Sequence, residues 1–473
     1  MLLSDDYLYN TATLSSLLRV NESFDLIERR LEVAGCELCF YYVDGFVKDG
    51  EMQRVMQTLL GQKEMGSAEK TLRTLPYVEV ELCKDCRKIV TAVLSGQAAL
   101  LCQTFGGEAI LLDLRTYPAR PTQEPDSDRV MQGAHDGFVE TLVMNTALIR
   151  RRVRDGRLTM KHLNLGGASA TDVVICYMSG VADPKIVDEI TEKIKNARPK
   201  SLTLGYQSLA ESIIRRGWLN PFPKIRTTER PDTAAAQVME GSVLVLCDTS
   251  PQVMILPTSI FDYLQQTDDY YFPPLTGTYM RIVRTLILIL SVIATPLWYL
   301  YLEYSDTLPE FLSFLIPENP GALPIILQLF LVEIALDGLK IASMNTPDML
   351  SNSLSVVGAL ILGDFAIEVG WLCADVIFYM AFVAIANFAQ QNHELGYAFK
   401  FVRVVTLLLT YLFGIWGFIL GILIFVYLVA TNKTVIGRRY LYPLIPFNGV
   451  AMKRLLLRER KKDFESPSEQ KHG

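Results

Sequence analysis

Residues 321–342 read GALPIILQLFLVEIALDGLKIA, an apolar run that nevertheless contains Glu333, Asp337 and Lys340. A helix needs roughly 20 mainly apolar residues to cross the hydrocarbon core of a bilayer, and this run is long enough. Ionisable side chains at membrane depth are costly, so they usually face a bundle interior or a water-filled path. The stretch therefore predicts a helical membrane domain, and its charged residues are the best pointer to function.

Two interpretations of this charged helix face stay open. Glu333 and Asp337 are four residues apart and share one face of a helix, and Lys340 follows Asp337 by three. Either the carboxylates form an acidic ring that favours cations once subunits assemble, or Asp337 and Lys340 form an internal ion pair that ties two helices together.

A second apolar run, LSVVGALILGDFAIEVGW (354–371), repeats this spacing with Asp364 and Glu368. No basic residue lies nearby in the sequence, so a water-filled path is the favoured environment for this pair. The candidate ion-pathway residues are therefore Glu333, Asp337, Lys340, Asp364 and Glu368. Ile361 stands where intramembrane aspartyl proteases have the first glycine of their G-x-G-D motif, and we expect no enzyme activity.

Outside these runs, composition divides the 473 residues sharply. The sequence predicts an α/β cytosolic N-terminal region of two α/β subdomains, followed by an α-helical multi-pass transmembrane domain. A segment rich in Pro and Asp, 117–128, reads as a linker. The predicted boundaries are 1–120 and 129–275 for the two subdomains, 279–430 for four to six membrane helices, and 431–473 for a basic and polar cytosolic tail.

Hydrophobic periodicity gives a coarse prediction of the soluble elements. The predicted helices are 23–35, 136–158 and 184–199, and the predicted strands are 36–46, 98–114 (broken by glycines), 171–180, 201–206 and 241–257. Arg150, Arg151 and Arg152 lie on the second helix. They either bind anionic lipid headgroups or an acidic partner face, or form an ordinary solvated face.

The number of membrane crossings is ambiguous. Five candidate spans are 280–302, 322–343, 353–370, 371–389 and 403–430. The loop 303–320 carries acidic residues but no Lys or Arg, so the positive-inside rule places it outside and the N-terminal region in the cytosol. The basic tail also predicts a cytosolic C-terminus, which requires an even number of crossings. Either 353–370 is re-entrant, which we favour, or 403–430 folds back around Gly414, Gly417 and Gly421.

Charge and cysteine content exclude other classes of function. The net charge of −6, without a basic stripe, gives no sign of nucleic-acid binding. The eight cysteines are scattered, which favours free thiols in a reducing compartment. The pairs Cys36/Cys39 and Cys83/Cys86 have zinc-ligand spacing, but neither interval contains the Gly or Pro of a tight turn. We therefore expect no metal and no cofactor.

Two blocks of the soluble region resemble the spore germination receptor A-subunit (GerA) family. They are QGAHDGFVETLVMNTALIRRRVRD (132–155) and TERPD (228–232), and the YPLIPF ending (442–447) continues the match. Within the family, DTSP (248–251) and LGDFAIEVGW (362–371) most resemble the stage V sporulation branch. The matching residues, to which we assign a structural or assembly role, are Gly133, Asp136, Gly137, Phe138, Glu140, Asn145, Arg150, Arg151, Glu229, Arg230, Pro231 and Asp232.

The resemblance implies an integral, multi-pass protein of the spore inner membrane, in contact with membrane lipid, with its N-terminal region on the spore-core side. It implies a homo-oligomer, with pentamers as the expected arrangement, around a cation pore that releases ions and amplifies the germination response. Other germination proteins of the spore inner membrane are the implied partners. A non-conducting scaffold that organises germination receptors is the alternative function.

Overall fold

The computed structural model describes residues 1–116, 133–197, 199–214, 220–266, 268–305, 310–345, 366–390 and 392–457. These residues form two compact units. Unit 1 comprises Met1–Arg216, Lys224–Thr258 and Thr434–Arg438, and unit 2 comprises Gly217–Pro223, Ser259–Lys433 and Arg439–Gly473. The short segment Thr434–Arg438 therefore returns to unit 1 after the last long helix of unit 2.

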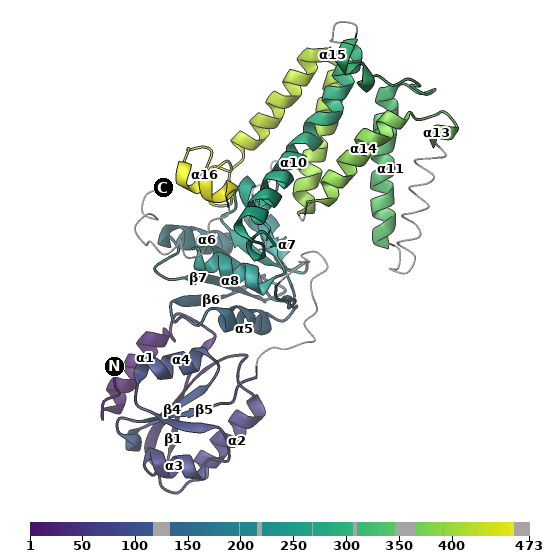
Figure 1. The fold of residues 1–473 in the computed structure, drawn as a ribbon. Helices are drawn as coiled ribbons and strands as arrows, with labels where there is room; N and C mark the ends of the chain where they lie inside the picture. Colours follow the sequence, from purple (N-terminus) through teal and green to yellow (C-terminus); the bar gives the residue numbers. More distant parts are fainter. Residues whose placement is uncertain are drawn as a thin grey trace. The chain divides into compact units, whose positions relative to one another are not determined.

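The first half of unit 1 is a five-stranded antiparallel sheet with helices on both faces (Figure 1). Its strands are β1 (Leu26–Val33), β2 (Cys36–Val43), β3 (Val80–Cys83), β4 (Ala98–Cys102) and β5 (Ala109–Leu112), in the order β1-β2-β4-β5-β3. Helices α1 (Tyr7–Leu18) and α4 (Cys86–Leu94) cover one face, and α2 (Asp49–Leu60) and α3 (Ala68–Thr74) cover the other. With both faces covered, β4 and β5 are buried along their whole length.

The second half of unit 1 repeats this topology. Its strands are β6 (Leu158–Leu165), β7 (Thr171–Met178), β8 (Arg226–Thr228), β9 (Val243–Cys247) and β10 (Val253–Leu256), in the order β6-β7-β9-β10-β8. Helices α6 (Pro184–Ala197) and α7 (Tyr206–Ile213) cover one face, and α5 (Leu142–Arg152) and α8 (Pro231–Met239) cover the other. Each sheet thus places its first, second, fourth, fifth and third strands side by side.

Several predicted elements differ from the observed ones. The strands predicted at 36–46, 98–114 and 171–180 and the helix at 184–199 are confirmed, and 241–257 contains two strands instead of one. The helix predicted at 23–35 is wrong, because this segment is strand β1. It pairs with β2 over eight residues, from Leu26 opposite Val43 to Val33 opposite Cys36. The strand predicted at 201–206 is wrong, and the helix predicted at 136–158 is confined to α5.

The C-x-x-C pair of β2 does not form a shared ligand set. Cys36 packs on the α2 and α3 face of the sheet, whereas Cys39 is buried on the α1 and α4 face. Successive side chains of a strand alternate between faces, so residues three apart point in opposite directions. Burial raises the pKa of the Cys39 thiol to about 12. All eight cysteines are free thiols.

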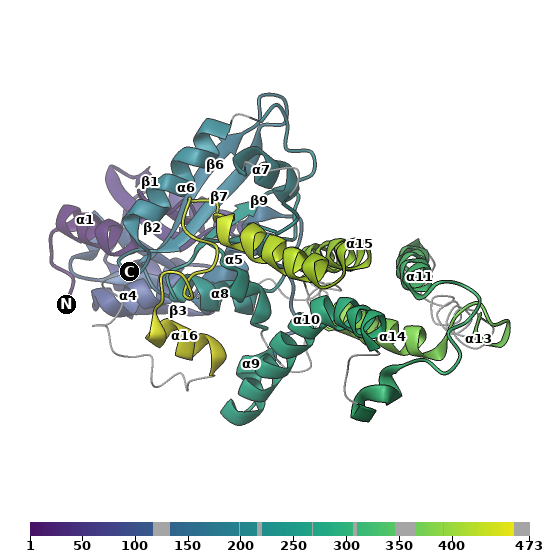
Figure 2. The same ribbon diagram turned by 90° about the horizontal axis from the view of Figure 1, so that it is seen from above.

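Unit 2 is helical in the residues that the structure describes. Its helices are α9 (Asp268–Tyr271), α10 (Pro274–Glu303), α11 (Ile325–Asn345), α13 (Ala366–Glu368), α14 (Ala374–Phe388), α15 (His393–Thr431) and α16 (Gly449–Leu456), with short 3-10 turns at Ile260–Leu264 and Glu310–Leu315. Helix α10 packs against α14 and α15, and α14 also packs against α11 (Figures 1 and 2). Among these helices, α10 and α15 are long and apolar enough to cross a membrane.

Helix α15 is a hairpin of two antiparallel arms. Gly414, with φ 57° and ψ −134°, interrupts the helix in a conformation that glycine adopts readily. Three pairs of residues lie close together across the arms: Gly417 and Leu409, Gly421 and Thr406, and Phe425 and Phe399. The residue numbers rise along one arm and fall along the other, so the arms are antiparallel. The chain therefore folds back around Gly414, the second of the two predicted alternatives. The alternative that we favoured, a re-entrant 353–370, falls mostly outside the described residues.

Candidate functional site

A cluster of four charged side chains joins α11 to the first arm of α15. Arg403 Nη2 donates to both carboxylate oxygens of Glu333, at 2.7 and 2.9 Å. Lys400 Nζ lies 3.0 Å from Glu333 Oε1 and also bonds to the Asp337 carboxylate. Glu333 and Arg403 are buried. The two acids and two bases balance, as expected of charges held at membrane depth.

The structure thus identifies the partners of the predicted acids. Asp337 pairs with Lys400, and the Lys340 ammonium lies 4.8 Å from the centroid of the Tyr397 ring. Sequence reasoning missed Lys400 and Arg403, which are more than 60 residues from Glu333. A signal was present, because a lysine and an arginine three residues apart interrupt an apolar run and would need counter-charges there.

Three residues of the cluster, Glu333, Asp337 and Lys400, line an open cavity of about 360 Å³ between α11, α14 and α15. Its polar lining includes Asp337, Lys340, His393 and Lys400, and its apolar lining includes Val332, Leu336, Met380 and Ala384. The Asp337 side chain is 39% exposed, whereas that of Glu333 is 11% exposed. Both acids line the cavity, and the Asp337 side chain is the more exposed of the two.

Of the second predicted acidic pair, only Glu368 is among the described residues, and it is not part of this cluster. Asp364 lies outside the described residues, and Glu368 is exposed at the end of α13. The amide of Ala322, just before α11, donates to the carbonyl of Gly370 at 2.8 Å, which places this region beside the start of α11. Glu333 lies eight residues into α11, about 12 Å along its axis at 1.5 Å per residue.

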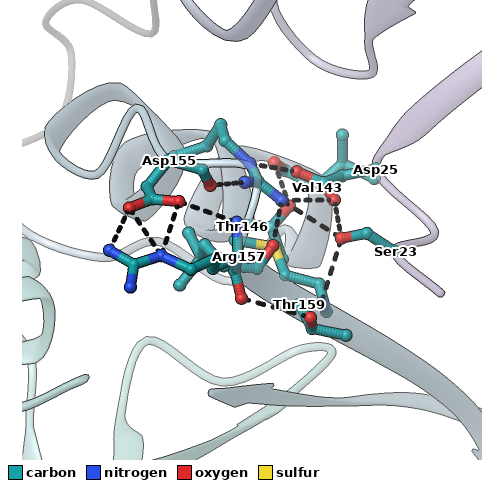
Figure 3. Close-up of polar contacts among 10 residues, drawn as sticks. Ser23, Asp25, Val143, Thr146, Asp155, Arg157 and Thr159 are labelled. Carbon is teal, nitrogen blue, oxygen red and sulfur yellow. Dashed lines mark hydrogen bonds and ion pairs between the residues drawn. The ribbon is translucent and has the colours of Figure 1, made fainter. Parts of the chain in front are cut away.

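Arg150 of the first family motif forms a buried network within unit 1, and its partners Ser23, Asp25 and Asp155 are labelled in Figure 3. Its Nε lies 2.7 Å from Asp25 Oδ2, and its Nη2 lies 3.0 Å from Asp25 Oδ1 and 3.1 Å from Ser23 Oγ. It also donates to the carbonyls of Asp155 and Leu158. Because Asp25 precedes β1 and Arg150 lies on α5, the pair joins the two halves of unit 1. Full burial excludes both interpretations proposed for Arg150, lipid binding and a solvated face.

Two hydrogen bonds join the two motif blocks. Arg230 Nη2 donates to the carbonyl of Ala134 at 3.0 Å and to Asp232 at 2.7 Å, and the amide of Phe138 donates to the carbonyl of Glu229 at 2.8 Å. Within the first block, Arg152 pairs with Asp136, and the Asn145 side chain bonds to the backbone of Val139. The Glu140 carbonyl accepts a hydrogen bond from the Thr249 amide, and Pro231 begins α8. Gly133 has φ 127°, Gly137 is buried, and Arg151 is exposed. The structural or assembly role that we assign to these residues stays a prediction.

Comparison with known proteins gives a consistent picture. The sequence profile of the Bacillus/Clostridium GerA spore germination protein matches residues 13–468. Stage V sporulation protein AF of Bacillus subtilis is 36% identical over 93% of this chain and 90% of its own length. Spore germination protein KA of Bacillus subtilis is 27% identical over 93% of this chain and 82% of its own. A solved structure, the N-terminal domain of the A subunit of the Bacillus megaterium spore germinant receptor GerK3, aligns with 54% of this chain and 96% of its own at 20% identity and a TM-score of 0.40.

Proposed function

The chain belongs to the GerA spore germination protein family, and on that premise we propose that it is a multi-pass protein of the spore inner membrane that conducts cations during germination. The half-exposed Asp337, at a cavity among apolar helices, is the observation that carries this proposal. As the family resemblance implies, subunits would assemble into an oligomer, a pentamer in our expectation. This oligomer would act beside other germination proteins and amplify the response without enzyme activity.

A six-pass arrangement with the N-terminal region on the spore-core side fits the described elements. The chain leaves unit 1 before α10, and Thr434–Arg438 belongs to unit 1 again after α15. A chain that returns to the side it left crosses an even number of times. The fold-back at Gly414 adds one crossing to the five predicted spans, so parity is met without a re-entrant 353–370.

The charged residues at the helix ends support the same orientation. Arg281 and Arg284 lie near the start of α10, where both pair with Asp269. Glu303 is the last residue of α10, at the opposite end of that helix, and Glu318 lies in the connection that follows, which contains no Lys or Arg. Because Lys and Arg accumulate on the cytosolic side of membrane proteins, the start of α10 is assigned to the spore core.

In the proposed pathway, Asp337 is the acid that a passing cation meets. Lys400 neutralises Asp337, and both side chains line the cavity. A cation in the cavity competes with Lys400 for the carboxylate, because close negative charge replaces part of the hydration that the ion loses. Glu333, held by two bases, has a structural role in this scheme.

The test is potassium efflux from liposomes that contain the purified protein. We expect Asp337→Asn to reduce the efflux at least tenfold and Lys400→Met to raise it, because it leaves Asp337 without its base. Asp375→Asn is the matched control, since it removes the same charge from α14 at a position that does not line the cavity. If Asp337→Asn and Asp375→Asn reduced potassium efflux equally, Asp337 would not be part of the cation pathway.

The paired state of Glu333 favours one other function, a non-conducting scaffold that organises germination receptors. A scaffold would keep its intramembrane charges neutralised in packed interfaces, as Glu333 is. This alternative predicts no efflux from well-folded wild-type protein. It also predicts that germination receptors co-purify with the chain from spore membranes.

A further inference from the structure

We propose that the cavity between α11, α14 and α15 binds an anionic membrane lipid, with the phosphate of its headgroup at Lys340 and an acyl chain in the apolar part. The proposal rests on the membrane-spanning arrangement proposed above. A lipid in this cavity would compete with a cation at Asp337, but binding of the lipid can be measured without ion flux. A cavity of about 360 Å³ holds the headgroup region and the first part of one chain.

Charge balance identifies the missing group. Among the described residues, Lys400 and Arg403 are matched by Glu333 and Asp337, whereas Lys340 has no acidic partner. The Tyr397 ring compensates only part of the cost of removing the Lys340 ammonium from water. The site therefore carries one uncompensated positive charge beside the cavity, and an anionic oxygen ligand would supply the counter-charge.

Polarity along the cavity matches a lipid in its natural orientation. Lys340 lies five residues before the end of α11, His393 begins α15, and Asn387 is the penultimate residue of α14, so the polar groups gather at helix ends. Val332 and Met380 line the cavity further inside the helices. In the proposed orientation the polar end lies on the spore-core side, where basic pockets between membrane helices bind phosphate headgroups.

The side chains around the cavity favour a lipid over a ligand from water. Ile341, Ile385 and Phe388 are large apolar residues that are exposed on α11 and α14. Phe388 lines the cavity, and the other two adjoin lining residues in the sequence. In a bilayer such side chains face acyl chains, since no water is present at that depth. A ligand that approaches the cavity past these residues therefore comes from the lipid phase.

The experiment measures lipid retained by the purified full-length protein after equilibration with mixed micelles of phosphatidylglycerol and phosphatidylcholine. We expect phosphatidylglycerol to be retained preferentially and Lys340→Ala to lower its apparent affinity about tenfold. Lys340→Arg should preserve binding because it keeps the charge. Ala384→Phe, which fills the apolar part, should also reduce retention. Lys433→Ala is the matched control, an exposed lysine of unit 2 that does not line the cavity.

Each other outcome overturns the proposal. Equal loss in Lys340→Ala and Lys433→Ala would mean that the lipid binds a general basic surface. Equal retention of the two lipids would exclude recognition of the negative charge. Displacement of the lipid by soluble glycerol phosphate at the same concentration would identify a free phosphate site. Since none of these readouts requires ion flux, failure here is distinguishable from failure of the proposed channel.

Discussion

The guanidinium of Arg150 illustrates how one residue ties together segments that are 125 positions apart. It is fully buried and bonded to both carboxylate oxygens of Asp25, so neither group can regain its hydration if the other is removed. Breaking a buried pair by deleting one partner costs about 3–5 kcal/mol, because an uncompensated charge stays in the interior. The motif arginine that sequence reasoning placed on a charged helix face is thus a packing element of the two-sheet unit.

We expect Arg150→Met to lower the free energy of unfolding by about 3–5 kcal/mol, measured by denaturant titration followed by circular dichroism. Arg154→Ala, an exposed neighbour, should change it by less than about 0.5 kcal/mol. The double variant Asp25→Leu, Arg150→Met should be more stable than either single variant, because it leaves no charge behind. If the losses of unfolding free energy in the two single variants simply added up in the double variant, a direct ion pair between Asp25 and Arg150 would be contradicted.

Asp155 gives a pH dependence with a definite sign. Side-chain hydrogen bonds from Arg157, opposed by partial burial, hold the pKa of Asp155 below its usual value of about 3.9. A carboxyl group whose pKa is lowered in the folded state stabilises the fold above the unfolded-state pKa, and this contribution is lost as the pH falls through the folded-state pKa. Asp155→Asn should therefore destabilise equally at about pH 6 and pH 7, and the difference should shrink below about pH 4. A difference that grows on acidification would be inconsistent with this assignment.

At the scale of elements, the α15 hairpin depends on glycines at its contact face. A Cβ at Gly417 would lie 1.8 Å from the carbonyl oxygen of Leu409, far inside any contact distance. We expect Gly417→Ala to separate the arms and to reduce the yield of monodisperse protein and its melting temperature. Gly338→Ala is the matched control, since a Cβ at this position in α11 has no atom within 4 Å. A glycine-to-alanine change in a helix interior without a clash is neutral or stabilising. Equal melting temperatures for the two variants would contradict the close packing of the arms.

An element could be predicted from the sequence when its own residues carry its hydrophobic period. Buried runs such as β7 and the amphipathic α6 carry their period in their own residues, and both were predicted correctly. Strand β1 was not, because Leu26, Ile27 and Leu31 also fit helical spacing and the decisive factor is its long pairing with β2. The hairpin at Gly414 was one of two open alternatives, since glycine spacing permits a turn but does not require it.

For the whole molecule, sequence identified the family and the acids, whereas the charge partners required the fold. Glu333 and Asp337 were found because carboxylates in an apolar run are conspicuous. Their neutralisation by Lys400 and Arg403 depends on α11 and α15 lying side by side, which no local pattern encodes. The same holds for Arg150 and Asp25, whose contact depends on how the two halves of unit 1 pack.

The even number of membrane crossings that we propose has a direct test in cells. Single cysteines would be introduced by Gln57→Cys in α2, Ser313→Cys in the connection after α10, and Lys433→Cys after α15, all at exposed positions. The parent chain is a suitable background because seven of its eight cysteines are buried. A membrane-impermeant maleimide should label Ser313→Cys in intact cells. It should label Gln57→Cys and Lys433→Cys only after permeabilisation, because a chain that crosses the membrane an even number of times has both ends on one side. Labelling of Lys433→Cys but not Gln57→Cys in intact cells would establish an odd number of crossings. In that case the α15 hairpin could not cross the membrane twice while 353–370 also crosses it once. Either the α15 hairpin or 353–370 would then have to enter and leave the membrane on the same side.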